Sequence, residues 1–377
     1  MDTKQRRRRI GLFAGALIVA TLTTVWLCHP EPTLIDISHA VGTVDEEKQD
    51  WKWLSDVELL VVATDKEPDN LLGAENEETH WQGHVEICNV VTGKRKQMAG
   101  LTNLLNRKGV SPTGRPELCA FSPDLTWLAW YNQKTLDHWP FPAAAHLDGT
   151  HYREWNCDRV SGSFLDDQHW IEQSDENGRN PPVTHIVDLE DNNKDRSYPS
   201  SAPQVAALVA EYAQRHPQFV SVEFSANQRS VEIATYHTAD ASSLVLAQEG
   251  EPRPHALTVQ NSSIKLPHGT YMIDSNVSPD QHTILYHLHT HSINPVLGLL
   301  HRILPNVSEE RLETESLWVS ETDGQGFHEI GHVVVPFVPQ DIARDAEKSV
   351  LSRIEWLPGG KQVAFVYRST LFVAPAK

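Results

Sequence analysis

The sequence predicts an all-β domain built from about six repeated four-stranded units, preceded by one apolar N-terminal segment. Three observations lead to this prediction: a recurring strand-turn-strand phrase, a second hairpin signal after several of its copies, and an uncharged run near the N-terminus. The chain has 377 residues, of which 40% are hydrophobic and 22% charged. This composition suits a globular chain that is long enough to bury a large core.

The N-terminal segment has the length and the flanks of a transmembrane anchor. Residues 1–9 are basic, and residues 10–28 begin with an uncharged apolar run from Ile10 to Leu27 that is just long enough to cross a bilayer. Arginines before this run place that end in the cytoplasm, so the rest is expected outside it, in the periplasm or at the cell surface. A cleaved signal peptide is the alternative, but Thr21 to His29 lacks the small-residue cleavage pattern.

The net charge argues against nucleic acid as a partner. The formal net charge is −18; the first thirty residues carry five basic and one acidic side chain, or +4, which leaves −22 for the remainder. A body of that charge repels nucleic acid and anionic lipid. We therefore expect no nucleic-acid partner.

The recurring phrase is an apolar strand, a short polar turn and a second apolar strand. In Ser122-Pro123-Asp124 and Ser278-Pro279-Asp280, the proline presets the first turn position and the aspartate tolerates the second. β-Branched and aromatic residues on both sides of the turn favour strands. Counting variants of the turn, the phrase occurs six times, with turns at Asp56, Asp124, Asp167, Asn227, Asp280 and Gly360.

A second hairpin signal follows several copies, so that each unit contains four strands. The turns recur at steps of 43 to 80 residues, against about 40–50 residues in ordinary units of this kind, and insertions are therefore expected. Residues 201–216 predict an amphipathic helix with Ser201 as its N-cap. Residues 291–315 contain an apolar patch, 296–304, whose spacing suits a second short helix. The second hairpin signals are residues 85–98, 144–153, 185–192 and 317–330.

These phrases resemble those of the TolB-like and WD-repeat β-propellers, whose units carry a similar S-P-D-G turn followed by a second hairpin. The resemblance covers most of residues 51–377 and implies about six four-stranded blades, with seven as the alternative. Residues 29–50 would link the ring to the anchor and could include a ring-closing strand. The last copy offers at most three strands before Lys377. Thr33 to Ser38 is therefore expected to supply the outer strand that closes the ring.

His328-Glu329-Ile330-Gly331-His332 matches H-E-x-x-H, in which two histidines bind zinc and the glutamate acts as a general base. Zinc binding needs a helix, because only a helical face brings both imidazoles to one ion. The preceding turn and the following Val333-Val334-Val335 favour a strand instead, the last strand of the fifth blade. On a strand, His328 and His332 would share a face but stand about 13 Å apart.

A second histidine cluster, His287, His289 and His291, alternates along one face of a predicted strand. Neighbours in this cluster are about 6.6 Å apart, so two of them could bind a metal together with a ligand from an adjacent strand. The other interpretation is a polar face of the blade, since the sequence alone identifies no carboxylate partner.

We expect a membrane-tethered, extracytoplasmic β-propeller that binds a protein or peptide partner through its loops, with the N-terminal helix in the membrane. The function is inferred from the resemblance, and it includes no catalytic residue, cofactor or metal. The alternative is a zinc-dependent hydrolase or peptidase that uses His328, Glu329 and His332, with Glu329 catalytic. Neither a G-x-S-x-G elbow nor a nucleotide-binding loop occurs in the chain.

Overall fold

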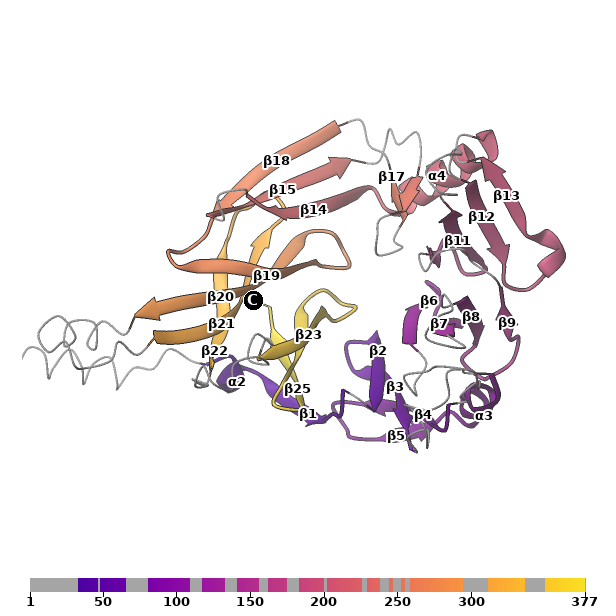
Figure 1. The fold of residues 1–377 in the computed structure, drawn as a ribbon, viewed down its shortest axis with the longest axis horizontal. Coiled ribbons are helices and arrows are strands. Elements are labelled where there is room, and N and C mark those ends of the chain that lie inside the picture. The colour runs from indigo at the N-terminus through magenta and orange to yellow at the C-terminus, as the bar shows by residue number, and fades with distance from the viewer. Residues whose placement is uncertain are drawn as a thin grey trace, which may run out of the picture.

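The computed structural model describes residues 33–46, 48–65, 81–108, 117–132, 141–155, 162–174, 183–199, 202–225, 229–237, 244–246, 252–254, 258–293, 311–335 and 350–376. Within these ranges the strands form six antiparallel sheets arranged around a ring, together with one separate two-stranded sheet (Figure 1). The chain is a six-bladed β-propeller, and the predicted fold class and blade number are confirmed.

The strands of each blade follow one another in chain order from the centre of the ring outward, except in the last blade (Figure 1). Blade 1 contains β2 (Gln49–Ser55), β3 (Glu58–Thr64), β4 (Gly83–Asn89) and β5 (Arg95–Gln97). Blade 2 contains β6 (Glu117–Phe121), β7 (Trp127–Asn132), β8 (Phe141–His146) and β9 (Arg153–Glu154). Blade 3 contains β10 (Gly162–Phe164), β11 (His169–Ser174), β12 (Val183–Asp188) and β13 (Arg196–Pro199). Blade 4 contains β14 (Gln218–Phe224), β15 (Ser230–His237) and β18 (Thr258–Lys265). Blade 5 contains β19 (Thr270–Val277), β20 (Thr283–Ile293), β21 (Arg311–Glu321) and β22 (His328–Val335). Blade 6 contains β23 (Leu351–Trp356), β24 (Gln362–Tyr367), β25 (Thr370–Pro375) and β1 (His39–Thr43).

The five predicted turns that lie in the described residues, at Asp56, Asp124, Asp167, Asp280 and Gly360, each fall between the two innermost strands of a blade, and the four second hairpins also lie where they were expected. The predicted turn at Asn227 lies outside the described residues. The aspartates of these turns act as the turn chemistry requires. Asp280 accepts a hydrogen bond from the Ser278 hydroxyl at 2.6 Å, and Asp124 accepts one from the Ser122 hydroxyl at the same distance. Local side-chain bonds of this kind stabilise the chain reversal.

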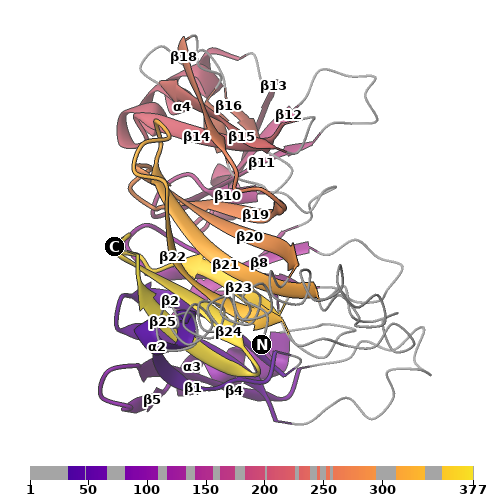
Figure 2. The ribbon, with the colours of Figure 1, turned by 90° about the vertical axis from the view of Figure 1, so that its left-hand side faces the viewer.

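An N-terminal strand closes the ring, as predicted, but a different segment supplies it. β1 pairs with β25, from His39 opposite Val373 to Thr43 opposite Thr370, and Figures 1 and 2 both show the two strands side by side. The expected segment, Thr33 to Ser38, is instead the short helix α2 (Leu34–Ile37) and its caps. Thr33 and Asp36 form a reciprocal capping box, which stabilises a helical turn at this point.

The fourth blade has three strands in the described residues rather than the four expected, because only four residues separate the end of β18 at Lys265 from the start of β19 at Thr270. A hairpin of β16 (Leu244–Leu246) and β17 (Pro252–Pro254) lies between β15 and β18 in the chain. The remaining secondary structure connects or flanks the blades: α3 (Ala99–Lys108), α4 (Pro203–Arg215) and the 3-10 turn η1 (Asn192–Lys194).

Helix α4 confirms the helix predicted over residues 201–216, although its N-cap is Ala202 and makes no side-chain hydrogen bond, so the predicted capping by Ser201 is wrong. Pro203 begins the helix, which its fixed φ permits. The second predicted helix, 296–304, and the predicted anchor, 10–28, lie outside the described residues. Among the residues that are described, no helix combines the length and the apolar composition needed to cross a bilayer.

The core lies between neighbouring blades, because the middle strands bury both of their faces. Along β20, Leu285 joins an apolar cluster shared with blade 6, whereas Ile284, Tyr286 and Leu288 join a cluster shared with blade 4. Strands buried on both sides are apolar at nearly every position. This explains why β24, with Val363 to Val366 buried, lacks a clean alternation of polar and apolar residues.

Candidate functional site

The H-E-x-x-H sequence occupies the outermost strand of blade 5, so its prediction as a strand is confirmed. The expectation that His328 and His332 share a face is wrong. His328 lies opposite Val319 and His332 opposite Ser316, and the register shifts by one residue between them, at Ile330. Such a bulge places the two imidazoles on opposite faces of the sheet, because paired residues point to the same side and alternate along the strand.

Each side chain of this sequence has a local role. His328 Nδ1 lies 2.6 Å from the Gly326 carbonyl oxygen, and His332 Nδ1 donates to Glu329 Oε1 at 2.8 Å. Gly331 is buried where α2 crosses the strand, and a Cβ there would lie 3.0 Å from the Leu34 Cα. The glycine therefore gives α2 room to pack, and no part of the sequence brings both histidines to one point.

The histidine row of β20 is organised differently. His287, His289 and His291 point to the side of the sheet that faces the start of β23, opposite Leu317, Glu315 and Glu313 of β21. His287 Nε2 and Glu315 Oε2 are 3.0 Å apart, and both side chains are buried. The same Glu315 carboxylate accepts the backbone N–H groups of Val350 and Leu351, each at 2.8 Å, which compensates its burial.

His289 is the second buried member of this row. Its ring stacks on Tyr271 with centroids 5.1 Å apart, and it is 9% exposed. Its buried Nε2 has no hydrogen-bond partner among the described residues. Burial, and next the neighbouring His291, lower the pKa of His289, so its neutral form prevails near pH 7.

His289, His291 and Glu313 form a compact group. His291 Nδ1 is 3.2 Å from Glu313 Oε1, His289 Nε2 is 3.8 Å from Glu313 Oε2, and one ligand atom from each residue lies within 4.8 Å of the others. The sequence analysis missed Glu313 and Glu315, although Glu313-Thr-Glu315 alternates in the same way as His289-Thr-His291. Only the register of two strands that are distant in sequence brings the two patterns together.

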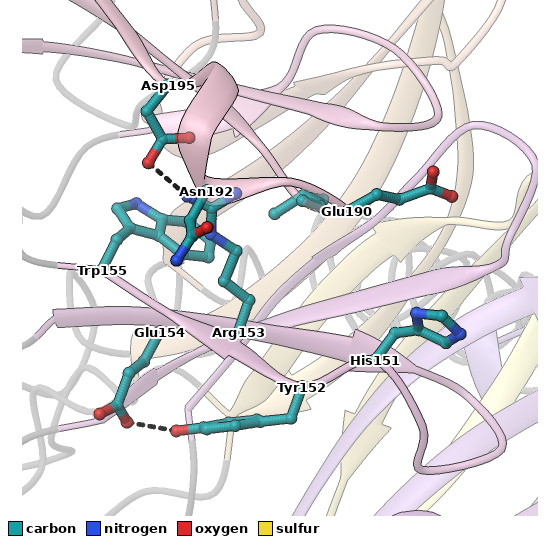
Figure 3. A pocket seen from close by; sticks show the side chains of 9 residues that line it. His151, Tyr152, Arg153, Glu154, Trp155, Glu190, Asn192 and Asp195 are labelled. Atoms are coloured by element: carbon teal, nitrogen blue, oxygen red, sulfur yellow. Dashed lines mark hydrogen bonds and ion pairs between the residues drawn. The ribbon is translucent and has the colours of Figure 1, made fainter.

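A groove lies between blades 2 and 3, on the side of the ring where the predicted turns lie (Figure 3). It encloses about 590 Å³. Arg153 forms an ion pair with Asp195 across the two blades, and the Tyr152 hydroxyl donates to Glu154 (Figure 3). The groove is lined by His151, Tyr152, Arg153, Glu154, Trp155, Leu189, Glu190, Asn192 and Asp195.

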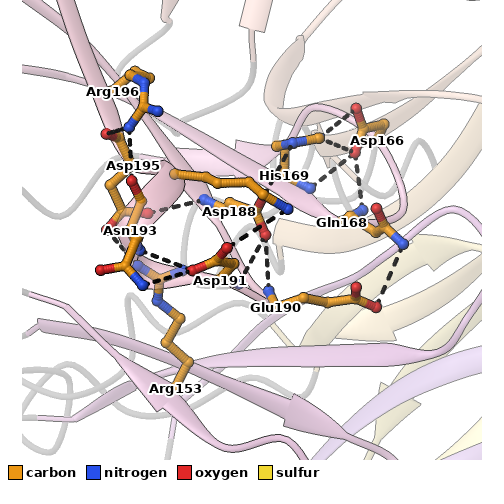
Figure 4. A network of polar contacts seen from close by, with 11 residues as sticks. Arg153, Asp166, Gln168, His169, Asp188, Glu190, Asp191, Asn193, Asp195 and Arg196 are labelled. Atoms are coloured by element: carbon orange, nitrogen blue, oxygen red, sulfur yellow. Dashed lines mark hydrogen bonds and ion pairs between the residues drawn. The ribbon is translucent and has the colours of Figure 1, made fainter.

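A polar network holds the blade 3 wall of this groove (Figure 4). Asp188 Oδ1 accepts the backbone N–H groups of Glu190 and Asp191, each at 3.0 Å, while the Asp188 N–H donates to Asp195 Oδ1 at 3.1 Å. Lys194 Nζ stands 3.6 Å from Asp191 Oδ2. These bonds fix the connection from β12 to β13 and hold Asp195 in position for Arg153.

The network also connects this wall to the first turn of blade 3. His169 Nδ1 lies 2.8 Å from Asp166, and His169 Nε2 lies 3.9 Å from Asp188 Oδ2. The hydrogen bond to Asp166 raises the pKa of His169, and partial burial opposes that rise. Burial also pushes the pKa of Asp166 upward, but its hydrogen bonds from His169 and Gln168 outweigh burial and leave that pKa lowered.

No family model and no curated protein matches the chain. Among solved structures, hydrazine synthase of Kuenenia stuttgartiensis is similar over 86% of this chain and 75% of that chain, with 14% identity and a TM-score of 0.34. TolB from Acinetobacter baumannii is similar over 74% of this chain and 51% of that chain, with 13% identity and a TM-score of 0.32. The β-propeller domain of the Trilobed protease from Pyrococcus furiosus is similar over 84% of this chain and 78% of that chain, with 12% identity and a TM-score of 0.31.

Proposed function

We propose that this chain is a non-catalytic binding propeller that takes a basic segment of a partner protein in the groove between blades 2 and 3. The carrying observation is the charge of that groove. Carboxylates outnumber guanidinium groups among its lining side chains, and the guanidinium of Arg153 is already paired with Asp195. Glu154 and Glu190 are exposed and form no ion pair within the described part of the chain.

Charge complementarity favours a basic occupant on two scales. Close to the groove, basic side chains of a bound segment would meet Glu154 at one end of the labelled cluster and Glu190 at the other, and neither carboxylate is ion-paired with a described residue (Figure 3). Farther out, the body of the chain carries −22, which attracts a cationic partner and speeds its encounter.

The aromatic residues of the groove suit the same occupant. Lys108 Nζ already lies 5.3 Å from the centroid of the Tyr152 ring, which shows that this ring accepts a cation on one face. The Trp155 indole is fixed by its hydrogen bond to Glu172 Oε2 at 3.1 Å. A rigid aromatic wall with a polar rim is the composition that protein-binding surfaces favour.

The alternative function, a zinc-dependent hydrolase at His328, Glu329 and His332, has less support. A catalytic zinc needs both imidazoles and an open coordination position. The bulge at Ile330 turns His328 and His332 to opposite faces, and Glu329 is hydrogen-bonded to His332.

The proposal includes a membrane tether. Residues 10–28 would anchor the chain, with residues 1–9 in the cytoplasm and the propeller in the periplasm or at the cell surface. Membrane fractions washed at alkaline pH should retain the full chain, and external protease should digest the propeller in spheroplasts. A chain found in the soluble fraction, or protected from external protease, would contradict this part of the proposal.

Binding of a labelled Lys/Arg-rich peptide, compared with an acidic peptide of the same length, tests the groove. We expect the basic peptide to bind in a salt-dependent manner and the double variant Glu154→Gln/Glu190→Gln to bind it about 10-fold more weakly, roughly 1.4 kcal/mol. Glu232→Gln is the matched control, because Glu232 is an exposed strand glutamate that also accepts a hydroxyl hydrogen bond. Equal binding of the acidic peptide, or equal weakening by Glu232→Gln, would contradict the proposal that the groove binds a basic segment.

A further inference from the structure

We propose that His289, His291 and Glu313 bind one divalent transition-metal ion of the zinc class at the end of blade 5 that lies away from the predicted turns. These residues stand on two paired strands, β20 and β21, with His291 opposite Glu313. Paired strands hold their side chains in fixed register, so the three donors converge without any rearrangement of a loop.

The distances suit a tetrahedral ion. Bonds of about 2.0–2.1 Å at tetrahedral angles place neighbouring ligand atoms about 3.3 Å apart. His291 Nδ1 and Glu313 Oε1 are separated by 3.2 Å, and His289 Nε2 and Glu313 Oε2 by 3.8 Å. One ligand atom from each residue lies within 4.8 Å of the others, so binding requires the side chains to close by up to about 1.5 Å onto the ion.

The buried Nε2 of His289 is an independent observation that points to a ligand. His289 is 9% exposed, and within the described residues its Nε2 has no hydrogen-bond partner. Leaving a buried polar atom unpaired destabilises the folded state. A metal ion between His289, His291 and Glu313 would accept the lone pair of this nitrogen and so give it a partner.

The surroundings of His289 match those of a metal-bound histidine. Its other nitrogen, Nδ1, lies 3.9 Å from Glu315 Oε1, on the side away from Glu313. Glu315 is itself held by His287 and by the N–H groups of Val350 and Leu351. At 3.9 Å this carboxylate is beyond hydrogen-bond distance of His289, but a fixed negative charge beside the imidazole favours a cation bound to it.

The donor set defines the class of ion. Two imidazole nitrogens and one carboxylate oxygen suit Zn²⁺, Co²⁺, Ni²⁺ or Cu²⁺, whereas Mg²⁺ and Ca²⁺ prefer oxygen donors throughout. The side chain of His291 is 47% exposed, so solvent reaches one side of the group. Water can therefore complete the coordination, and this open position distinguishes the site from a closed structural one.

The test is zinc binding by the full chain, purified without a histidine tag and freed of metal by a chelator. Competition between the protein and a chromophoric chelator gives the affinity and the stoichiometry. We expect one tight Zn²⁺ per chain, and an affinity at least about 10-fold lower in each of His289→Ala, His291→Ala and Glu313→Gln. Co²⁺ should give a visible absorption band in the native chain that is lost in His291→Ala.

His332→Ala is the matched control, since it removes a half-buried histidine from the next strand of the same blade. His289 is buried against Tyr271, and its replacement can disturb folding. His291 and Glu313 are more exposed, so His291→Ala and Glu313→Gln decide the question if His289→Ala unfolds. Unchanged zinc affinity in both of these variants, or loss of binding in His332→Ala alone, would overturn the site.

Discussion

Asp50 of β2 and Arg353 of β23 join the first blade to the last, with Asp50 Oδ1 2.5 Å from Arg353 Nη1. The other oxygen of Asp50 accepts the Leu118 N–H of blade 2 at 3.0 Å, and the Arg353 guanidinium lies 4.3 Å from the centroid of the Trp51 ring. One buried carboxylate therefore connects three consecutive blades at the point where the ring closes.

Replacing Asp50 should destabilise the closed ring. In Asp50→Asn, an amide NH2 group replaces one carboxylate oxygen, so either Arg353 or the Leu118 N–H loses its hydrogen-bond acceptor. We expect the free energy of unfolding to fall by about 2–3 kcal/mol, a value below that of a fully buried pair because Arg353 is 29% exposed. Urea denaturation measures this change, with Glu58→Gln, an exposed carboxylate of the neighbouring strand, as the control.

The closing strand gives a second prediction. Removing residues 1–44 takes away β1 and α2, leaves the edge of β25 unpaired and exposes the pocket filled by Leu34, which is fully buried. We expect a lower melting temperature and concentration-dependent aggregation, because an unpaired edge pairs with other chains. Removal of residues 1–32 is the control. Equal melting temperatures and light scattering for the two truncations would show that β1 does not stabilise the ring.

The turns of the propeller could be predicted because their chemistry is local. Ser122, Asp124, Ser278 and Asp280 bond within the turn itself, so a few adjacent residues determine the reversal. The same local reasoning applies to the capping box of Thr33 and Asp36, three residues apart, which the interpretation of this segment as a strand overlooked. Once that helical turn is recognised, the closing strand moves to β1.

The candidate sites could be predicted only in part, because they depend on the register of distant strands. The alternation of His287, His289 and His291 identifies a face, but their partners Glu313 and Glu315 become visible only when β20 is aligned with β21. The bulge at Ile330 depends in the same way on contacts of β22 with β21 and with α2. The groove between blades 2 and 3 combines two C-terminal blade hairpins, and no pattern within one of them indicates it.

The H-E-x-x-H strand gives a prediction about which of its residues stabilises the fold. Gly331→Val adds bulk where α2 already limits the space, since even a Cβ would lie 3.0 Å from the Leu34 Cα. We expect a loss of about 2 kcal/mol or more in the free energy of unfolding. Glu329→Gln and His332→Ala, at half-buried positions, should each cost less than about 1 kcal/mol. The reverse order of these losses in urea denaturation would indicate that the carboxylate and imidazole, rather than the glycine, hold the strand.

The pair formed by His169 and Asp166 predicts how stability changes with pH. Because the pKa of His169 is raised in the folded state, its contribution is complete below the unfolded pKa of about 6.5 and is lost as the pH rises through the raised value. The pKa of Asp166 is lowered, so its contribution is present above about pH 4 and is lost only in stronger acid. The pair should therefore stabilise the fold most between about pH 4 and pH 6.5.

Comparison of the native chain with His169→Gln at pH 5.5 and pH 8 measures this effect. Both side chains are about a third exposed, and solvent screening reduces the expected difference to about 0.5 kcal/mol, present at the lower pH and absent at the higher. The exposed His39, replaced by glutamine, is the control. Proton NMR of the His169 ring gives its pKa directly, and a midpoint below 6.5 would show that Asp166 does not hold the charged imidazole.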